Sequence, residues 1–306
     1  MKTNGKIRTR GEDKVATYGD IYLDARRRMK AAGIENADFE ARDLVCCAAN
    51  KRAEVFLRDR QLAAPAAILQ KAERMVDRRI EGEPLAYILG EWDFYGMTLS
   101  VSPAVLIPRN DTEVLVDWTA AVLRKKYGEN EFRFLDLGCG SGCIGIALAQ
   151  LFPTARGVLM DVSPNAVELA KDNVKRYSML NRLFCVPGDM LDRADERIGK
   201  FDVIVSNPPY ITEAEMLELD ESVREFEPRG ALCGGEDGLD FYRAILNGWL
   251  KLLKDGGFIA FEVGYLQARD VARLMKDAGI EKIKIVEDTQ GIARVVSGFK
   301  KVSEGE

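Results

Sequence analysis

The residues with the clearest potential for chemistry are Asn207, Pro208, Pro209 and Tyr210, which directly follow the apolar run at 203–205. The β-branched residues of that run predict a buried strand, and two consecutive prolines must end it. The side-chain carbonyl of Asn207 and the backbone carbonyl of Pro208 then present two acceptors at the carboxyl end of a strand. Open α/β sheets bind their ligands at such strand ends.

Two neighbouring acceptors suit a planar NH2 group, because that group carries two N–H donors. Asn207 can accept one hydrogen and Pro208 the other, while the ring of Tyr210 stacks on the flat face. An amide or aromatic amine nitrogen is a poor nucleophile, and acceptors aimed at its hydrogens stabilise the positive charge that builds on it during attack. We therefore predict catalytic roles for Asn207, Pro208 and Tyr210 without a titratable base. Substrate contacts are predicted for these three and Pro209, with an ordinary Pro-rich turn as the alternative.

A second turn of unusual composition follows the apolar run at 132–137. It consists of Gly138, Cys139, Gly140, Ser141 and Gly142. Alternating glycines between a strand and a helix let a ligand approach the backbone closely. The third glycine of a dinucleotide-binding turn is missing, since that position holds Cys143, and no Lys-Ser or Lys-Thr pair completes a P-loop. A nucleoside without a pyrophosphate fits this turn best, and a tight turn with no ligand is the alternative.

Acidic residues stand near the ends of three predicted strands. Asp161, which follows the first glycine of the turn by 23 residues, can accept both ribose hydroxyls. Asp136 can receive a cationic amino group, while Asp189 and Met190 stand where an adenine edge and face would lie, unless they are a loop acid and a packing methionine. A nucleoside with a cationic amino acid arm is S-adenosylmethionine, whose methyl group would face Asn207. We predict this cofactor.

Composition excludes several other classes of protein. The 306 residues are 47% hydrophobic and 30% charged, as in a globular protein with one large domain and one small one. No apolar run approaches the roughly 18 residues of a membrane span, and no apolar core follows the basic amino terminus, so we expect no membrane partner and a cytoplasmic location. The chain has no histidine, and its six cysteines form no C-x-x-C pair, so we expect no metal site.

The net charge of −5 is a poor match to a protein that grips duplex phosphates, and we expect no direct nucleic-acid partner. The charge is uneven, because residues 1–90 carry 18 Lys and Arg against 14 Asp and Glu. This basic front could meet an acidic or RNA-bearing partner, or it could be a solvated helix surface.

The elements that must position these residues divide the chain into four parts. Residues 1–16 are polar, and we expect a flexible leader there. Helical periodicity fills 17–83, which predicts a small helical domain. Alternating apolar residues over 84–107 predict a β-hairpin linker with its turn at Gly96. Strands that alternate with helices over 108–306 predict a Rossmann-like α/β domain, with a doubly wound and mostly parallel sheet of seven strands.

Two local signals make sharper predictions about helices. Asp38 stands where a side chain would cap a helix that Asn50 ends. The apolar pattern from Phe241 to Leu253 predicts one continuous helix.

These motifs together resemble a known family, the class I S-adenosylmethionine-dependent methyltransferases that modify a glutamine amide of peptide chain release factors (the HemK/PrmC family). The Asn-Pro-Pro-Tyr sequence alone is shared with DNA adenine-N6 methyltransferases. The resemblance is narrowed by E-P-L-A-Y-I-L-G at 83–90, I-P-R-N-D-T-E at 107–113, and the segment from Glu227 to Leu239. It extends from about Asp38 to Phe299.

The resemblance implies that residues 138–142, Asp161, Met190 and Asn207 contact S-adenosylmethionine. It also implies that residues 207–210 hold the glutamine of the Gly-Gly-Gln loop of a class 1 release factor, which the helical front would dock, so that methylation tunes translation termination. The sequence departs from the family at Asn110, where proline is usual. It also departs at Met190, where some members have an aromatic residue.

Three other functions are compatible with parts of this sequence. A glutamine methyltransferase of a ribosomal protein would differ only in what the helical front docks. A DNA adenine methyltransferase would share the Asn-Pro-Pro-Tyr turn, but the acidic charge and the lack of a basic target-reading domain disfavour it. A non-catalytic adaptor for a release factor or the ribosome would have no need of the complete glycine turn.

Overall fold

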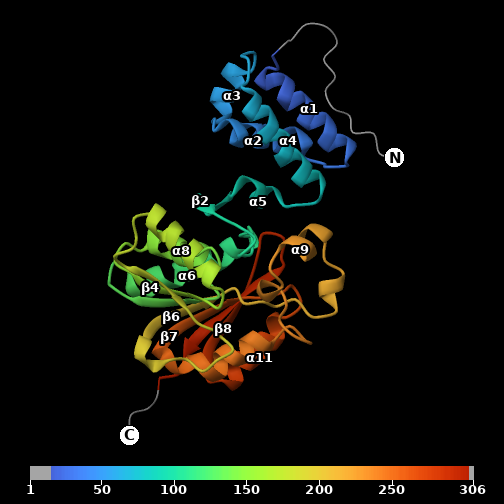
Figure 1. The fold of residues 1–306 in the computed structure, drawn as a ribbon. Coiled ribbons are helices and arrows are strands. Elements are labelled where there is room, and N and C mark those ends of the chain that lie inside the picture. The colour runs from blue at the N-terminus through green and yellow to red at the C-terminus, as the bar shows by residue number, and fades with distance from the viewer. Residues whose placement is uncertain (1–14, 303–306) are drawn as a thin grey trace. The chain divides into compact units, whose positions relative to one another are not determined.

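The computed structural model describes residues 15–302, so all but the last two residues of the predicted leader lie outside the described residues. The chain divides into two compact units, which are residues 1–89 and residues 90–306 (Figure 1). No helix in the described range 15–302 is long and apolar enough to cross a membrane.

The first unit is helical. Its helices are α1 (Tyr18–Ala31), α2 (Ala37–Ala49), α3 (Ala53–Asp59), α4 (Ala66–Ile80) and α5 (Leu85–Leu89). The side chain of Thr17 accepts from the backbone N–H of Asp20, and the Asp20 carboxylate accepts from the Thr17 backbone, which forms a capping box at α1. Buried Met29, Leu44 and Phe56 belong to the core of this unit. The helix α5 was not predicted, because it lies in the stretch that was expected to form only a hairpin.

The predicted cap of α2 is wrong. The helix begins one residue before Asp38, after Asn36, and no side chain caps it. Asp38 instead forms ion pairs with Arg26 and Lys30, which hold the pKa of its carboxyl below its ordinary value. The predicted end of the helix is confirmed, since Asn50 adopts the left-handed conformation that stops it.

The second unit begins with a hairpin of β1 (Glu91–Phe94) and β2 (Met97–Ser100), paired antiparallel. Tyr95 and Gly96 both have positive φ, as a two-residue type I′ turn requires. Phe94, Met97 and Leu99 are buried and pack into the core of the large sheet. The hairpin is therefore part of the framework of this unit.

The large sheet has seven strands, as predicted. Across the sheet they run β5 (Leu183–Pro187), β4 (Arg156–Asp161), β3 (Arg133–Leu137), β6 (Phe201–Ser206), β7 (Leu253–Glu262), β9 (Ala293–Lys300) and β8 (Ile280–Glu287). The five strands from β5 to β7 are parallel, while β9 and β8 are antiparallel to their neighbours. The predicted doubly wound, mostly parallel α/β fold is thus confirmed.

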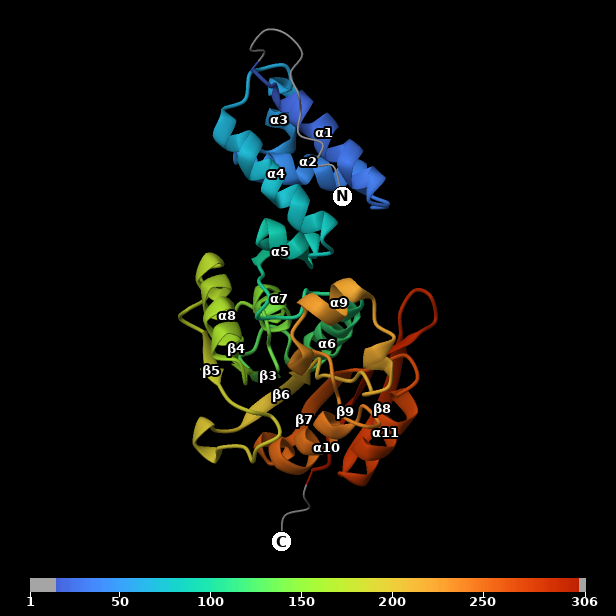
Figure 2. The ribbon, with the colours of Figure 1, turned by 45° about the vertical axis from the view of Figure 1, so that its right-hand side comes forward.

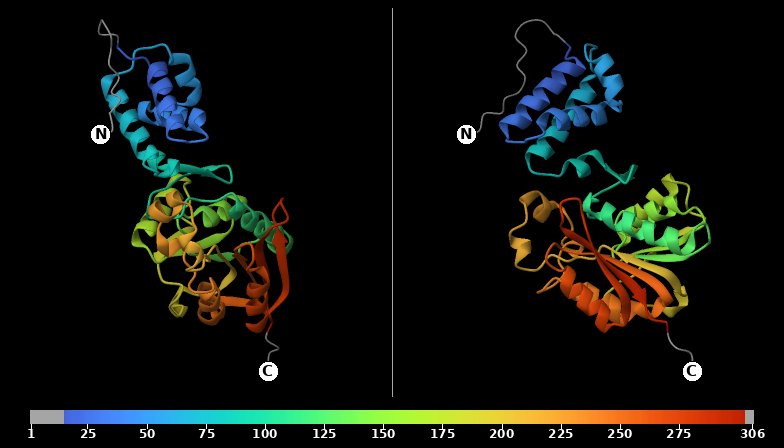
Figure 3. Two further views of the ribbon diagram at one scale, coloured as in Figure 1. Left: turned by 90° about the vertical axis from the view of Figure 1, so that its right-hand side faces the viewer. Right: turned by 180° about the vertical axis from the view of Figure 1, so that it is seen from behind.

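Helices cover both faces of this sheet (Figure 2 and Figure 3). They are α6 (Asp111–Tyr127), α7 (Cys143–Leu151) and α8 (Pro164–Arg176) on one face, with α10 (Asp240–Ala244) and α11 (Ala268–Asp277) on the other. Successive strand residues alternate between the two cores: Phe134 packs with the first set and Leu135 with the second. This two-sided burial explains why the strands read as continuous apolar runs.

One predicted helix is broken into three pieces. The helix α10 ends at Ala244, a π-helical turn spans Ile245–Trp249, and a 3-10 turn spans Leu250–Leu252. The π-helical turn ends at Trp249, whose indole N–H donates to the backbone carbonyls of Met190 and Asp192, each at 3.0 Å. The break therefore coincides with a contact that fixes one of the predicted cofactor-binding loops.

Candidate active site

The candidate site lies where the order of strands reverses, between β3 and β6. These strands are neighbours in the sheet but are separated in the chain by β4 and β5, so loops leave them in opposite directions and open a crevice. Leu137 pairs with Ser206, and the Ser206 hydroxyl donates to the Leu137 carbonyl at 2.6 Å. This register places the residues that follow, Gly138 and Asn207, beside one another.

A cavity of about 510 Å³ opens at this point. The predicted site residues that line it are Gly138, Cys139, Gly140, Ser141, Asp161, Asp189, Met190, Asn207 and Pro209. Four predicted site residues are not among those that line it: Asp136, Gly142, Pro208 and Tyr210. One cavity therefore joins the predicted cofactor residues to the predicted substrate residues, and its volume suits a small ligand.

The glycine turn (residues 138–142) depends on the absence of side chains. Its three glycines have φ values of +71°, +53° and +82°, in the region that favours glycine. A Cβ atom on Gly138 would lie 2.6 Å from Cε of Met190, and one on Gly142 would lie 3.1 Å from the Leu159 side chain. Gly138 therefore brings its backbone against Met190, which the sequence predicts to face the adenine, while Gly142 packs its turn onto the sheet.

Asp161 ends β4 and faces the glycine turn. One carboxylate oxygen accepts from the Gly140 N–H and the other from the Ser163 N–H, both at 2.9 Å. Each oxygen keeps a second lone pair for a ligand. The carboxylate is thus fixed by the backbone on both sides and can accept two vicinal hydroxyls.

Asp136 lies beneath the glycine turn and is fully buried. Its Oδ2 accepts from the Gly145 N–H at 2.9 Å, and its Oδ1 has no partner within the described part of the chain. Burial raises the pKa of this carboxyl to about 7. The structure therefore separates Asp136 from the cavity that the other cofactor residues line.

Asn207 presents an oriented amide to the cavity. Its Nδ2 donates to Oγ1 of Thr112 at 3.2 Å. No donor among residues 15–302 bonds its Oδ1 or the carbonyl of Pro208. Both predicted acceptors are thus without a donor in this range, and of the two residues only Asn207 lines the cavity.

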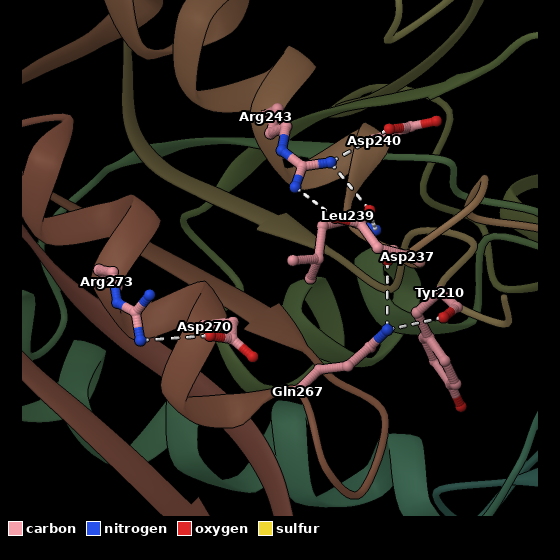
Figure 4. A network of polar contacts seen from close by, with 9 residues as sticks. Tyr210, Asp237, Leu239, Asp240, Arg243, Gln267, Asp270 and Arg273 are labelled. Atoms are coloured by element: carbon pink, nitrogen blue, oxygen red, sulfur yellow. Dashed lines mark hydrogen bonds and ion pairs between the residues drawn. The ribbon is translucent and has the colours of Figure 1, made fainter.

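The side chain of Gln267 supports the Asn-Pro-Pro-Tyr turn (residues 207–210) through a hydrogen bond to its last residue, Tyr210 (Figure 4). The Gln267 Nε2 donates to the carbonyls of Tyr210, at 2.8 Å, and Gly238, at 3.3 Å, while its Oε1 accepts from the Gly264 N–H. A Cβ atom on Gly238 would lie 2.3 Å from the Tyr210 carbonyl oxygen, so this close approach requires glycine. One side-chain amide therefore ties the turn to two other segments.

Two buried glutamates lie beside the site, and sequence reasoning assigned a role to neither. Glu262 ends β7 next to Asn207, and the Tyr210 hydroxyl approaches its Oε1 at 3.5 Å. Burial raises the pKa of Glu262 to about 7. Glu227 pairs with Arg109 and accepts from the Ile107 N–H at 3.1 Å, which holds one wall of the cavity. For Glu262 the signal was available, since an acid at the end of an apolar strand run is unusual.

Fold and site together define a class I S-adenosylmethionine-dependent methyltransferase. The glycine turn and Asp161 fit a nucleoside, and Asn207 lines the same cavity. The family model described as "Methyltransferase small domain" matches residues 112–226, and the family model described as "PrmC N-terminal domain" matches residues 20–90.

Sequence similarity to named proteins identifies the family within this class of methyltransferases. The chain is 40% identical to a release factor glutamine methyltransferase of Geobacter sulfurreducens, over 89% of this chain and 93% of that protein. It is 37% identical to one of Koribacter versatilis, over 94% of this chain and 100% of that protein. The chain belongs to the release factor glutamine methyltransferase family. Among solved structures, the hMettl16 catalytic domain shares the fold, with a TM-score of 0.54 at 14% identity, covering 78% of this chain and 83% of that one.

Proposed function

We propose that this chain transfers a methyl group from S-adenosylmethionine to the side-chain amide nitrogen of a glutamine in the Gly-Gly-Gln loop of a class 1 peptide chain release factor. The observation that carries the proposal is the shared cavity. In it the glycine turn and Asp161 meet Asn207, whose side-chain oxygen has no donor among the described residues. The names of the relatives supply the substrate class.

In this proposal the cofactor is held by the glycine turn and the residues around it. Asp161 accepts the ribose hydroxyls, and Asp189 and Met190 contact the adenine edge and face. When bound, the cofactor would supply a sulfonium methyl group as the electrophile, and on breaking of its S–CH3 bond it would leave as the neutral thioether S-adenosyl-L-homocysteine. Asp136, beneath the glycine turn, acts on a cationic amino group only at a distance, because it does not line the cavity.

Catalysis in this proposal rests on hydrogen-bond acceptors. Asn207 Oδ1 accepts one N–H of the glutamine amide and the Pro208 carbonyl accepts the other, which orients the nitrogen lone pair and stabilises the charge that develops on nitrogen. The same acceptors hold the proton that the nitrogen must lose until water removes it. Pro209 lines the pocket, whereas Tyr210 does not line it and packs against the core behind the turn. Burial raises the pKa of the Tyr210 hydroxyl, so this group stays neutral and is no base.

We further propose that residues 17–83 form the docking domain for the release factor, that 84–107 link it, and that 108–306 form the methyltransferase domain. A release-factor substrate is present where translation ends, which favours a cytoplasmic location. Mixed surface charge in residues 1–90 is compatible with a partner that carries both protein and RNA contacts.

Methyl transfer from labelled S-adenosylmethionine to purified release factor tests this proposal. We expect tandem mass spectrometry to find one methyl group on the loop glutamine, and none on a matched release factor in which alanine replaces that glutamine. Labelling of a ribosomal protein or of DNA, with both release factors unlabelled, would contradict it. Absence of cofactor binding in calorimetry would instead indicate a non-catalytic adaptor.

A further inference from the structure

The two ends of the Asn207 side-chain amide differ in chemistry. Only Oδ1 can accept a hydrogen from a substrate NH2 group, because Nδ2 is itself a donor and its hydrogens would face those of the substrate. Rotation of the amide by a half turn exchanges the two ends at almost no steric cost. A group outside Asn207 must therefore select the orientation that leaves Oδ1 facing the cavity.

Thr112 is that group. It is the second residue of α6, it is 2% exposed, and its Oγ1 accepts from Asn207 Nδ2 at 3.2 Å. A hydroxyl can also donate, and a Thr112 hydroxyl that donated to Oδ1 would select the opposite orientation of the amide. The hydrogen of Thr112 must therefore point to a different acceptor.

Glu262 is the acceptor that we assign to that hydrogen. Ser206 of β6 pairs with Phe261 of β7, so Asn207 and Glu262 follow paired residues on neighbouring parallel strands. The Thr112 side chain acts to lower the pKa of the buried Glu262 carboxyl, so the two groups lie close together, and Glu262 Oε2 has no hydrogen-bond partner in the described range. A carboxylate can only accept, which leaves the Thr112 oxygen free to accept from Asn207.

We propose that Thr112 and Glu262 are positioning residues, which fix the Asn207 amide with its oxygen toward the substrate. The inference rests on the proposed function, because it assigns them to the orientation of the group that accepts the substrate hydrogen. Thr112 also lines the cavity, whereas Glu262 does not and acts only through Thr112.

The charge of Glu262 is set by groups on every element around it. Asp111 on α6 opposes ionisation and Arg294 on β9 favours it, as do the hydroxyls of Thr112 and Tyr210. Tyr242 on α10 donates to the backbone carbonyl of Glu262 at 2.8 Å. Protonation of Glu262 adds an O–H that competes for the Thr112 oxygen, which weakens the orientation of Asn207.

A matched pair of variants separates orientation from packing. Thr112→Val keeps the shape and removes the hydroxyl, whereas Thr112→Ser keeps the hydroxyl and removes a methyl group. We expect Thr112→Val to lower kcat about five- to tenfold, the scale of one hydrogen bond, with cofactor affinity changed less than about twofold. Thr112→Ser should stay within about threefold of the wild type. Equal kcat in wild type and Thr112→Val, or a greater loss in Thr112→Ser, would overturn the proposal.

The pH profile tests the second positioning residue. In the wild type kcat should fall as the pH drops through about 7, where Glu262 gains its proton. Glu262→Gln should lose this acid limb, because its side chain does not titrate in that range. An acid limb that persists unchanged in Glu262→Gln would remove Glu262 from the proposal.

A measurement that requires no methyl transfer tests the orientation of Asn207 separately from the proposed function. In protein labelled with nitrogen-15 asparagine, the side-chain NH2 signals of Asn207 are identified by their loss in Asn207→Ala. We expect one of these hydrogens to exchange with water at least about tenfold more slowly than those of exposed asparagines, and Thr112→Val to abolish that protection. Unprotected hydrogens in the wild type would overturn this proposal even if Thr112→Val did not fold. Failure to methylate a release factor would leave the exchange result unchanged and would contradict only the proposed function.

Discussion

The glycine turn and the Asn-Pro-Pro-Tyr turn meet at one cavity, yet the chain builds them by different means. The first is made by its own backbone, with three glycines at positive φ and a carboxylate, Asp161, held by two backbone N–H groups. The second is fixed by side chains from afar, since Thr112 lies 95 residues before Asn207 and Gln267 lies 57 residues after Tyr210. The glycine turn is therefore encoded locally and the Asn-Pro-Pro-Tyr turn by tertiary structure.

This contrast predicts that variants at the two turns fail in different ways. Changes at the cofactor end should weaken cofactor binding, and changes at the substrate end should lower kcat at saturating cofactor.

The largest effect is expected at Asn207. Asn207→Ala removes an acceptor that acts on developing charge, so kcat should fall by about two orders of magnitude, or roughly 3 kcal/mol of barrier. Cofactor affinity should change less than about threefold. Single-turnover rates and calorimetry measure the two quantities. Asn181→Ala, at an exposed position that does not line the cavity, is the matched control and should retain activity. A loss below about threefold in Asn207→Ala would show that the assigned role is wrong.

The next effect is expected at Asp161. Asp161→Ala removes the acceptors for the ribose hydroxyls and should weaken cofactor binding by roughly 1–3 kcal/mol, while kcat at saturating cofactor falls much less. Isothermal titration with S-adenosylmethionine measures the affinity. Asp172→Ala, at an exposed position of α8, is the control. If affinity is unchanged, Asp161 does not hold the ribose and the cofactor end needs another anchor.

A smaller effect is expected at Gln267. Gln267→Met keeps the length of the side chain but leaves the Tyr210 carbonyl without its donor, which should lower the free energy of unfolding by about 1–2 kcal/mol. Because the turn loses its support, kcat should fall several-fold with cofactor affinity unchanged. Chemical denaturation and steady-state kinetics test both parts. Gln290→Met, at an exposed site, serves as the control, and weakened cofactor binding in Gln267→Met would break the contrast between the two turns.

The same contrast explains how far the sequence could lead. All seven strands and the glycine turn were predicted because β-branched runs, glycines and prolines act on their own backbone. The α5 helix and the break after Ala244 were not, since burial and a long-range contact of Trp249 decide them. The partners of Asn207 were missed because no local pattern states which distant side chain will meet it. Asp38 was misassigned because ion pairs with a neighbouring helix outweighed a cap.

The smallest effect is expected beneath the glycine turn, where Asp136 titrates. Burial raises its pKa from 3.8 to about 7, so its contribution to stability is fully present below the unfolded value and is lost as the pH rises through about 7. Asp136→Asn keeps the acceptor for the Gly145 N–H and removes the titration. Between about pH 6 and 7.5 the free energy of unfolding of the wild type should fall by about 1 kcal/mol relative to the variant. Other titrating groups, Glu262 included, are present in both proteins and cancel in the difference. Denaturation curves at four pH values measure it, and parallel pH dependences would show that Asp136 does not titrate in this range.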